Sequence, residues 1–404
     1  MPALPRDKKH RYPRLMIRKG REGRLQMGHP WVYEGEVATV KGNPADGDVV
    51  DCHNIRGAFL GRGYFNSQSK IRLRIVTRDA TAEVNDDLLR QHLDLALERR
   101  RRFYPEATSL RLVHAEGDIL PGLTVDRYED VLVMQCASLA MDRRHERLAA
   151  FLQELTGIEH VYLRNDNSVR RNDGLELSQG FFSAPFATQF PIHQNGLTFE
   201  VDLVDGHKTG FYLDQADNHL ALRHLVPAGG SVLDACCYTG AFALHAAAAG
   251  AGMVLGIDSS EAALAIAQRN AAHNNFADTC SFELWNVFDA LRQFEKRGQQ
   301  FDVVVLDPPS FTRNRNAIAK ARAGYKEINL RALKILRPGG VLLTFTCSYY
   351  IDRASFETML QEAAGDARRQ LIIRQRCGQA GHHPEVLAVP ETGYLKGIAV
   401  EAWR

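Results

Sequence analysis

The order of apolar and polar positions divides the chain into three stretches of different texture. Residues 14–80 hold short β-type runs such as VATV, DVVDCH and IRLRIV, separated by Gly, Asn, Pro and Asp. Short runs between turn residues are typical of a small barrel-like β module. We therefore predict strands, with tight turns between them, in this first stretch.

The second stretch mixes helical and strand-like patterns. Leu88, Leu93 and Leu97 recur at helical spacing, which predicts a helix over residues 85–104. The run from Arg99 to Arg102 falls in its last turns, where positive charge suits the helix dipole, and we interpret it as a solvated helix end. Strand-like segments LRLVHA, GLTVDRY, VLVMQCA and VYLRND, with a helix near 142–156, indicate a compact α+β insert over residues 81–190.

From about residue 195, apolar β runs alternate with Ala-rich helical segments. The runs include SVLDACC, MVLGID, FDVVVLD and GVLLTFTC, and the helical segments include EAALAIAQRNAAHNN and INLRALKIL. This alternation predicts a doubly wound, mostly parallel sheet. Ligands bind outside the carboxyl ends of the strands of such a sheet, so the residues after each run are the candidates for chemistry.

Composition narrows the class of protein. The 404 residues are 45% hydrophobic and 24% charged, as expected of an ordinary soluble globular protein with two or three domains. No secretory signal or membrane span is recognisable, so we expect a cytoplasmic protein without a membrane partner. Seven scattered cysteines without a CxxC pair indicate reduced thiols and no metal site.

The net charge of +2 conceals an asymmetry along the chain. Residues 1–80 hold 16 Lys and Arg against 8 Asp and Glu, whereas residues 81–404 hold 34 against 40. A basic amino-terminal region suits a polyanionic partner such as RNA, because neutralising phosphates releases counterions. A basic surface can equally be merely solvated.

Three strand ends suggest an S-adenosylmethionine (AdoMet) site. The turn from Asp234 to Gly240 lacks both the GxGxxG pattern and the lysine of a phosphate-binding loop, which disfavours a dinucleotide or ATP. Asp234 could accept from the ammonium group of AdoMet, and Asp258, 24 residues later, from its ribose hydroxyls. Asn286 and Phe288 could contact the adenine edge and face, although Asn286 could equally be a turn residue.

Two further strand ends suggest the reaction. Asp307 precedes Pro308 and Pro309, which stiffen a turn that could support a flat ring, and Cys347 follows the next strand. Carbon 5 of cytosine is not nucleophilic until a thiolate adds at carbon 6. Asp307 could hydrogen-bond to the base as that addition occurs. The pair therefore favours cytosine-5 methylation of an unpaired or flipped base.

With these residues in place, the chain resembles the bacterial large-subunit ribosomal RNA cytosine-5 methyltransferases. The resemblance covers nearly the whole chain. It is carried by KGREGRLQMGHPWVY at 19–33, GDILPGLTVDRY at 117–128, GHKTGFYLDQADN at 206–218, YTGAFA at 238–243, DPPSF at 307–311, GYKEINLRAL at 324–333, TFTCS at 344–348 and ETGYLKG at 391–397.

The resemblance implies an α/β fold of three domains. These are a β-barrel PUA domain at 1–82, a central α+β domain at 83–192, and a class I Rossmann-like AdoMet methyltransferase domain at 193–404. It implies Cys347 as the nucleophile, assisted by Asp307, with large-subunit ribosomal RNA as partner and a homodimer left open. The cofactor residues that the resemblance implies are Phe211, Gln215, Tyr238, Thr239, Gly240, Phe242, Asp258, Asn286 and Phe288. To these we add Asp234 and Asp307 as predicted cofactor residues, and we predict Pro308, Pro309, Phe311 and Lys326 as substrate residues.

Two other functions stay open at this stage. The first is a 7-methylguanine or other base-nitrogen methyltransferase on the same fold, whose chemistry would not need the thiol of Cys347. The second is a non-catalytic RNA-binding or ribosome-assembly protein that uses the basic β module. The fold alone does not separate them, because many methyl acceptors share this sheet.

Overall fold

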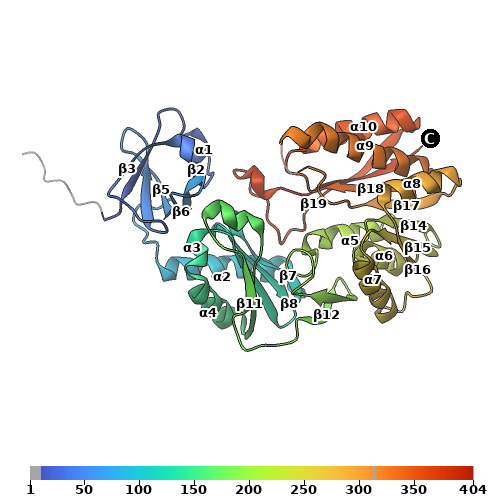
Figure 1. The fold of residues 1–404 in the computed structure, drawn as a ribbon, viewed down its shortest axis with the longest axis horizontal. Coiled ribbons are helices and arrows are strands. Elements are labelled where there is room, and N and C mark those ends of the chain that lie inside the picture. Colours follow the sequence, from blue (N-terminus) through green and yellow to red (C-terminus); the bar gives the residue numbers. More distant parts are fainter. Residues whose placement is uncertain (1–10, 313–314, 404) are drawn as a thin grey trace, which may run out of the picture. The chain divides into compact units, whose positions relative to one another are not determined.

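The computed structural model describes residues 11–312 and 315–403, which form two compact units (Figure 1). The first unit holds residues up to 106, residues 110–187 and the segment 382–392. The second holds residues 107–109, 188–381 and 393 onward. No helix in these described ranges is long and apolar enough to cross a membrane.

The amino-terminal β module of the first unit is a six-stranded sheet in the order β2-β6-β5-β4-β1-β3. Its core contains Leu15, Ile17, Val50 and Leu73, which come from alternate positions of its strands and are 0% exposed. The strands predicted over residues 14–80 are therefore confirmed. Their bounds are β1 Arg14–Ile17, β2 Trp31–Tyr33, β3 Val37–Lys41, β4 Val49–His53, β5 Phe59–Phe65 and β6 Ile71–Thr77, with α1 at Gly23–Gln26 and η1 at Glu34–Glu36.

The rest of the first unit is built on a five-stranded sheet in the order β11-β10-β9-β8-β7. Helix α2 begins after Asn85, whose side chain accepts a hydrogen bond from Leu88 N, and it confirms the predicted helix. The other bounds are β7 Ser109–His114, β8 Leu123–Tyr128, β9 Val131–Cys136, β10 His160–Asn165, β11 Ser178–Phe181, α2 Asp86–Phe103, α3 Leu139–Asp142, α4 His145–Thr156, η2 Ala115–Asp118 and η3 Ser168–Asp173.

The interpretation of the arginine run as a solvated helix end was wrong for one member. Arg100 is only 2% exposed, and its guanidinium group donates to both carboxylate oxygens of Asp118, at 2.6 and 2.8 Å. It also donates to the carbonyl oxygen of His382, at 2.8 Å. A buried charge must be paired and hydrogen-bonded, so Arg100 helps to hold segment 382–392 in the first unit. The predicted domain boundaries at 82 and 192 stay a prediction.

The second unit contains a seven-stranded sheet in the order β16-β15-β14-β17-β18-β20-β19. The first five strands run parallel, and β20 pairs antiparallel with both neighbours. This confirms the doubly wound, mostly parallel sheet. The strand bounds are β14 Ser231–Ala235, β15 Met253–Asp258, β16 Cys280–Leu284, β17 Phe301–Leu306, β18 Leu336–Thr346, β19 Leu371–Gly378 and β20 Lys396–Ala402, with a separate hairpin of β12 Gln189–Gln194 and β13 Leu197–Asp202.

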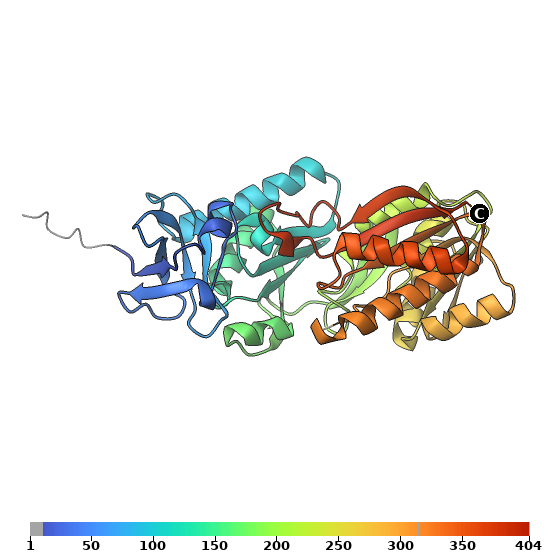
Figure 2. The same cartoon turned by 90° about the horizontal axis from the view of Figure 1, so that it is seen from above.

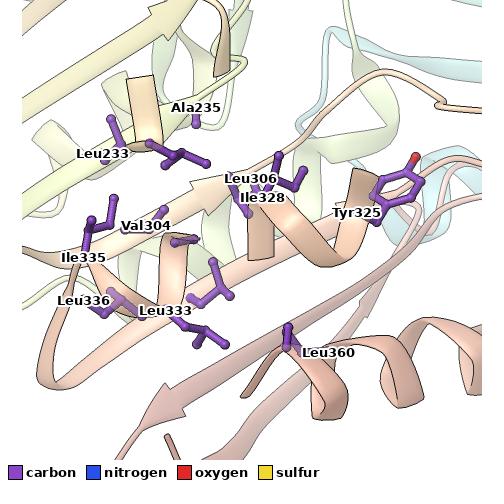
Figure 3. Close-up of a cluster of buried hydrophobic side chains, with 14 of the residues drawn as sticks. Leu233, Ala235, Val304, Leu306, Tyr325, Ile328, Leu333, Ile335, Leu336 and Leu360 are labelled. Atoms are coloured by element: carbon purple, nitrogen blue, oxygen red, sulfur yellow. The ribbon is translucent and has the colours of Figure 1, made fainter. Parts of the chain in front are cut away.

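Helices cover both faces of this sheet (Figure 1). On one face, α8, α9 and α10 pack on a core that includes Leu233, Leu306 and Ile328, and Figure 3 shows these side chains between helix and strands. Figure 2 shows α10 and α9 side by side along the sheet. The helix bounds are α5 Ala216–Arg223, α6 Ala241–Ala248, α7 Glu261–His273, α8 Val287–Lys296, α9 Ile318–Lys334 and α10 Arg353–Ala367, with η4 at Leu213–Gln215 and η5 at Arg315–Ala317. The short helix η6, Pro390–Thr392, belongs to the first unit.

The strand order reverses direction between β14 and β17. The chain runs outward through β15 and β16 on one side of β14, and through β17 and β18 on the other. Crossover loops at such a point leave a crevice at the carboxyl ends of the strands. The loops after β14, β15, β17 and β18 therefore meet around one space.

Candidate active site

A pocket of about 500 Å³ occupies this crevice in the second unit. Its volume suits a small-molecule ligand. Of the residues implied by sequence, the pocket is lined by Phe211, Gln215, Tyr238, Thr239, Phe242, Asp258, Asn286, Phe288, Asp307, Pro308, Pro309, Phe311 and Cys347. The structure thus brings together residues that lie more than a hundred positions apart in the sequence. Asp234, Gly240 and Lys326 are the three predicted site residues that do not line it.

The turn from β14 into α6, residues 236–240, is named here the cofactor turn. Cys236, Tyr238 and Gly240 all have positive φ, at 65°, 49° and 85°. Only glycine adopts such values without steric cost, so the two other residues store backbone strain of the kind that concentrates at functional sites. Gly240 ends the turn, and a Cβ at this position would lie 3.2 Å from Ala267, Leu244 and Phe282, so a side chain there would be crowded as well as strained.

Asp234 lies behind the cofactor turn and is 0% exposed. One carboxylate oxygen accepts from Ala243 N at 2.9 Å, and burial raises the pKa of this carboxyl group to about 8. The other oxygen, Oδ1, and the buried hydroxyl Oγ1 of Thr239 have no hydrogen-bond partner within residues 11–312 and 315–403. Buried polar atoms are normally hydrogen-bonded, so the unpartnered hydroxyl group of Thr239, which lines the pocket, fits a bond to a polar group of a ligand such as AdoMet. Asp234 does not line the pocket, and its predicted contact with the ammonium group stays a prediction.

Asp258 joins the cofactor turn to the loop after β15. Its two carboxylate oxygens accept from Tyr238 N and from Ser260 N, each at 2.9 Å. These bonds fix the carboxylate at the pocket wall, and each oxygen keeps a second lone pair for a hydroxyl group. The position therefore fits the predicted contact with ribose.

Asn286 has a structural role that the sequence left open. Its side-chain oxygen accepts from Phe288 N at 3.0 Å and caps helix α8. The amide nitrogen is not used by this cap, so the cap and a ligand contact are compatible. Phe288 lies in the pocket wall 5.8 Å from the ring of Phe311, and the two rings offer apolar surface to a flat ligand.

Asp307 lines the pocket directly after β17. One oxygen accepts from Gln215 Nε2 at 2.9 Å, and Gln215 is itself held by Asn218, which donates to its oxygen at 2.6 Å. Burial, and then the negative charge of Asp214, raise the pKa of Asp307 to about 7, against the hydrogen bond from Gln215 and the positive charge of Lys208. Near neutral pH this carboxyl group can therefore either carry a proton or lose it.

Cys347 brings a thiol to the same pocket. All seven cysteines lie in the described part of the chain as free thiols. Cys347 is the one among them that is exposed. The surrounding protein and the carboxyl group of Asp307 raise the pKa of the thiol, and the ammonium group of Lys208 lowers it. The resting thiol is therefore protonated at neutral pH, and its activation depends on its charged neighbours.

Sequence reasoning missed a cluster of polar side chains in the pocket, formed by Lys208, Asp214 and Tyr394. Lys208 forms an ion pair with the buried carboxylate of Asp214, and Tyr394 donates to the same oxygen at 2.7 Å. The ammonium group also lies 4.5 Å from the ring centre of Tyr212. The motifs GHKTGFYLDQADN and ETGYLKG contain these residues, so the signal was present, but only the fold shows that they meet.

Lys326 was predicted to bind substrate, and the structure places it elsewhere. Its ammonium group forms an ion pair with Asp366 of α10, at 2.8 Å, and does not line the pocket. Its substrate role stays a prediction. Within the described ranges, no group of three or more His, Cys, Asp or Glu side chains could hold a metal ion.

Comparison with known proteins defines the class. Residues 15–78 match the PUA-like domain family, and residues 160–396 match the S-adenosylmethionine-dependent methyltransferases. The second match covers more than half of the chain, and the chain therefore belongs to this methyltransferase family. The predicted fold class, enzyme class and AdoMet cofactor are confirmed.

Two relatives are similar along nearly the whole chain, and both are named Ribosomal RNA large subunit methyltransferase I. The protein of Photobacterium profundum is 39% identical over 390 residues, which is 95% of this chain and 98% of its own. That of Shewanella amazonensis is 40% identical over 394 residues, 96% and 99% of the two chains. The family resemblance carried by the motifs is thereby confirmed.

Solved structures share the fold at lower identity. A candidate SAM-dependent methyltransferase from Streptococcus mutans has a TM-score of 0.82 at 20% identity, covering 96% of this chain and all of its own. A candidate methyltransferase solved in complex with SAH has a TM-score of 0.83 at 21% identity and the same coverage. At such identity the likeness concerns the fold.

Proposed function

We propose that the protein methylates carbon 5 of a cytosine in large-subunit ribosomal RNA, with Cys347 as the nucleophile. The observation that carries this proposal is the exposed thiol of Cys347 in the same pocket as Asp307 and the residues suited to AdoMet. A base-nitrogen acceptor would need no thiol there, because its lone pair attacks without covalent help. The substrate class follows the names of the two relatives.

The residues that would hold AdoMet surround the cofactor turn. Asp258 would accept from the ribose, Phe288 would pack on adenine, and the unpartnered hydroxyl group of Thr239 would bond to the amino-acid end. Asp234 would support the cofactor turn from behind through its bond to Ala243 N. When bound, AdoMet supplies a methyl group activated by a positively charged sulfur. Every other step is carried by the side chains and the base.

The chemistry begins when the thiol of Cys347 gives up its proton, to solvent or to the ionised carboxyl group of Asp307, and becomes a thiolate. Its electron pair forms a bond to carbon 6 of cytosine, and the electrons of the 5,6 double bond move toward carbon 5, which becomes nucleophilic. A protonated Asp307 would donate a hydrogen bond to ring N3 and stabilise the charge as it forms. After carbon 5 takes the methyl group, a base removes its proton, the double bond re-forms and the thiolate leaves.

The target base must leave any helix to reach this chemistry. Pro308 and Pro309 stiffen the wall beside Asp307, and Phe311 lies in the same wall, so an extruded ring could lie against them. The basic β module would supply affinity for RNA through phosphate contacts. A ribosomal RNA substrate would place the protein in the cytoplasm.

The test is to incubate the protein with isotopically labelled AdoMet and unmodified large-subunit RNA, and to identify the labelled nucleoside by mass spectrometry. The proposal expects 5-methylcytidine from the wild type and none from Cys347→Ala. Cys377→Ala is a matched control, because that thiol is buried in β19 away from the pocket. Label in a guanosine derivative, or full activity of Cys347→Ala, would refute the proposal in favour of a base-nitrogen methyltransferase.

A further inference from the structure

The turn that carries Cys347 is joined to the loop after β17 by a chain of hydroxyl groups. Ser348, the next residue, is 0% exposed, and its Oγ lies 2.9 Å from the hydroxyl oxygen of Tyr325 and 2.9 Å from Ser310 Oγ. Ser310 in turn donates to the carbonyl oxygen of Thr312, at 2.9 Å. These hydrogen bonds thus link helix α9, the turn that carries Cys347 and the loop of residues 307–312, which is named here the Pro-Pro loop.

Counting protons gives this chain a direction. Each hydroxyl group has one proton to donate, and the carbonyl of Thr312 can only accept. All three 2.9 Å contacts receive a proton in one arrangement: Tyr325 donates to Ser348, Ser348 donates to Ser310, and Ser310 donates to Thr312. The longer contact of 3.4 Å from Tyr325 to the carbonyl of Pro309 is then secondary. Tyr325 is therefore the first donor, on which the other bonds depend.

The backbone of Ser348 is held as well as its side chain. Its N–H donates to Thr346 Oγ1 at 3.2 Å, and its carbonyl oxygen accepts from the buried ammonium group of Lys396 at 2.9 Å. Thr346 and Lys396 are themselves register partners in β18 and β20. Both neighbours of Cys347 are thus fixed, while Cys347 itself projects to the pocket.

The apolar core fixes the first donor. Tyr325 is 0% exposed, and its ring lies 4.4 Å from that of Phe311. Figure 3 shows the Tyr325 ring at the end of the core cluster, with its hydroxyl oxygen directed away from the neighbouring leucine and isoleucine side chains. Close-packed cores move little, so this hydroxyl is a firm anchor.

We infer that the hydrogen-bonded hydroxyl groups of Tyr325, Ser348 and Ser310 keep Cys347 at a fixed position relative to Asp307. Tyr325, Ser348 and Ser310 are thus positioning residues for methyl transfer. Ser310 follows Asp307 by three residues in the Pro-Pro loop, and Ser348 follows Cys347 directly, so the chain ties the two catalytic side chains together. Small misplacements of reacting groups are costly, since a shift of about 1 Å can slow a reaction about a hundredfold. The inference rests on the proposed function.

The sharpest variant is Tyr325→Phe, which removes one oxygen and keeps the buried ring. We expect kcat for 5-methylcytidine formation to fall about tenfold or more, because Ser348 loses its donor. The KM for RNA and the affinity for AdoMet should stay within about twofold, as should the alkylation rate of Cys347 at pH 8, because no charge near the thiol changes. Tyr64→Phe is the matched control, a buried tyrosine of the first unit at 4% exposure.

A second variant separates positioning from stability. Ser348→Ala breaks the same chain, so the double variant with Tyr325→Phe should lose no more kcat than the worse single variant. Two independent, additive losses would overturn the inference. An unchanged kcat in Tyr325→Phe would also overturn the inference. So would a fall in kcat accompanied by equal falls in AdoMet affinity and melting temperature, because that would indicate a general loss of structure. A wild type that labels another nucleoside would overturn the proposed function first, before any variant is compared.

Discussion

Replacing Asp307 by asparagine should make the thiol of Cys347 more reactive and the enzyme slower. The carboxyl group of Asp307 opposes formation of the thiolate, and it titrates with a pKa of about 7. Asparagine keeps the shape and a hydrogen-bonding amide but never carries the negative charge. The two effects of the side chain, on the thiol and on the base, are thereby separated.

The size of the effect follows from the pKa. With a pKa of about 7, Asp307 is about 10% ionised at pH 6 and about 90% ionised at pH 8. If its charge shifts the thiol by about one pKa unit, coupled titration gives Asp307→Asn about fivefold more thiolate at pH 8 and about the same amount at pH 6. Methyl transfer should instead fall about a hundredfold, because an amide can donate a hydrogen bond to N3 but has no acidic proton to share with the base.

The assay is the rate of alkylation of Cys347 by iodoacetamide between pH 6 and pH 9, read by mass spectrometry of the Cys347 peptide without RNA. Asp289→Asn is the control, because that carboxylate lies on exposed helix α8 with a side chain that is 67% exposed. An alkylation rate within twofold of wild type at pH 8, or an equal increase at pH 6, would show that the charge of Asp307 does not act on the thiol.

Three further predictions follow from single side chains. Lys208→Gln should slow alkylation of Cys347 at pH 8 about fivefold or more, because the charge of Lys208 favours the thiolate. Lys208→Arg keeps that charge and should retain most of the rate. Lys334→Gln is the control, because Lys334 is as exposed as Lys208 and also forms an ion pair. Tyr349→Ala should raise the KM for RNA about fivefold or more, since this ring is 63% exposed two residues after the nucleophile and offers a base a stacking face, whereas Tyr349→Phe should not. The pKa of Asp234 is raised to about 8 in the folded protein, so the folded state holds a proton that the unfolded state releases, and wild-type stability falls as pH rises from about 4 to 8. Between pH 5 and pH 8, the free energy of unfolding of Asp234→Asn should therefore rise relative to that of the wild type by a few kcal/mol, as measured by thermal or urea unfolding without AdoMet. An equal pH dependence of the two proteins would contradict this.

The sequence predicted those parts of the site that depend on the ends of strands. Apolar runs show where parallel strands end, and parallel strands end at one edge, so Asp258, Asp307 and Cys347 could be brought together without coordinates. Asn286 shows the limit of this reasoning, because one side chain can cap a helix and face a pocket at once. Local pattern cannot rank these two roles.

The residues that sequence reasoning missed are those defined by partners far away in the chain. Arg100 looks like part of a solvated basic run until Asp118 and the carbonyl of His382 are seen beside it. Lys326 shows the same limit, because its ion pair with Asp366 on the neighbouring helix cannot be read from the sequence, although its substrate role stays a prediction. Periodicity encodes which face of an element is buried, but not which charged partner a side chain meets.

The electrostatics of the pocket show which charges act on the thiol of Cys347, the proposed nucleophile. Burial and the carboxyl groups of Asp307 and Asp214 raise the pKa of Cys347, and the charge of Lys208 and a backbone hydrogen bond lower it. Asp214 is paired with Lys208, so Asp307 is the carboxyl group whose charge acts more strongly on the thiol. A proton on Asp307 removes that repulsion and, in the same step, creates the donor that a cytosine ring requires at N3. Under the proposed function, we therefore expect thiolate formation and recognition of the base to be coupled through this one proton.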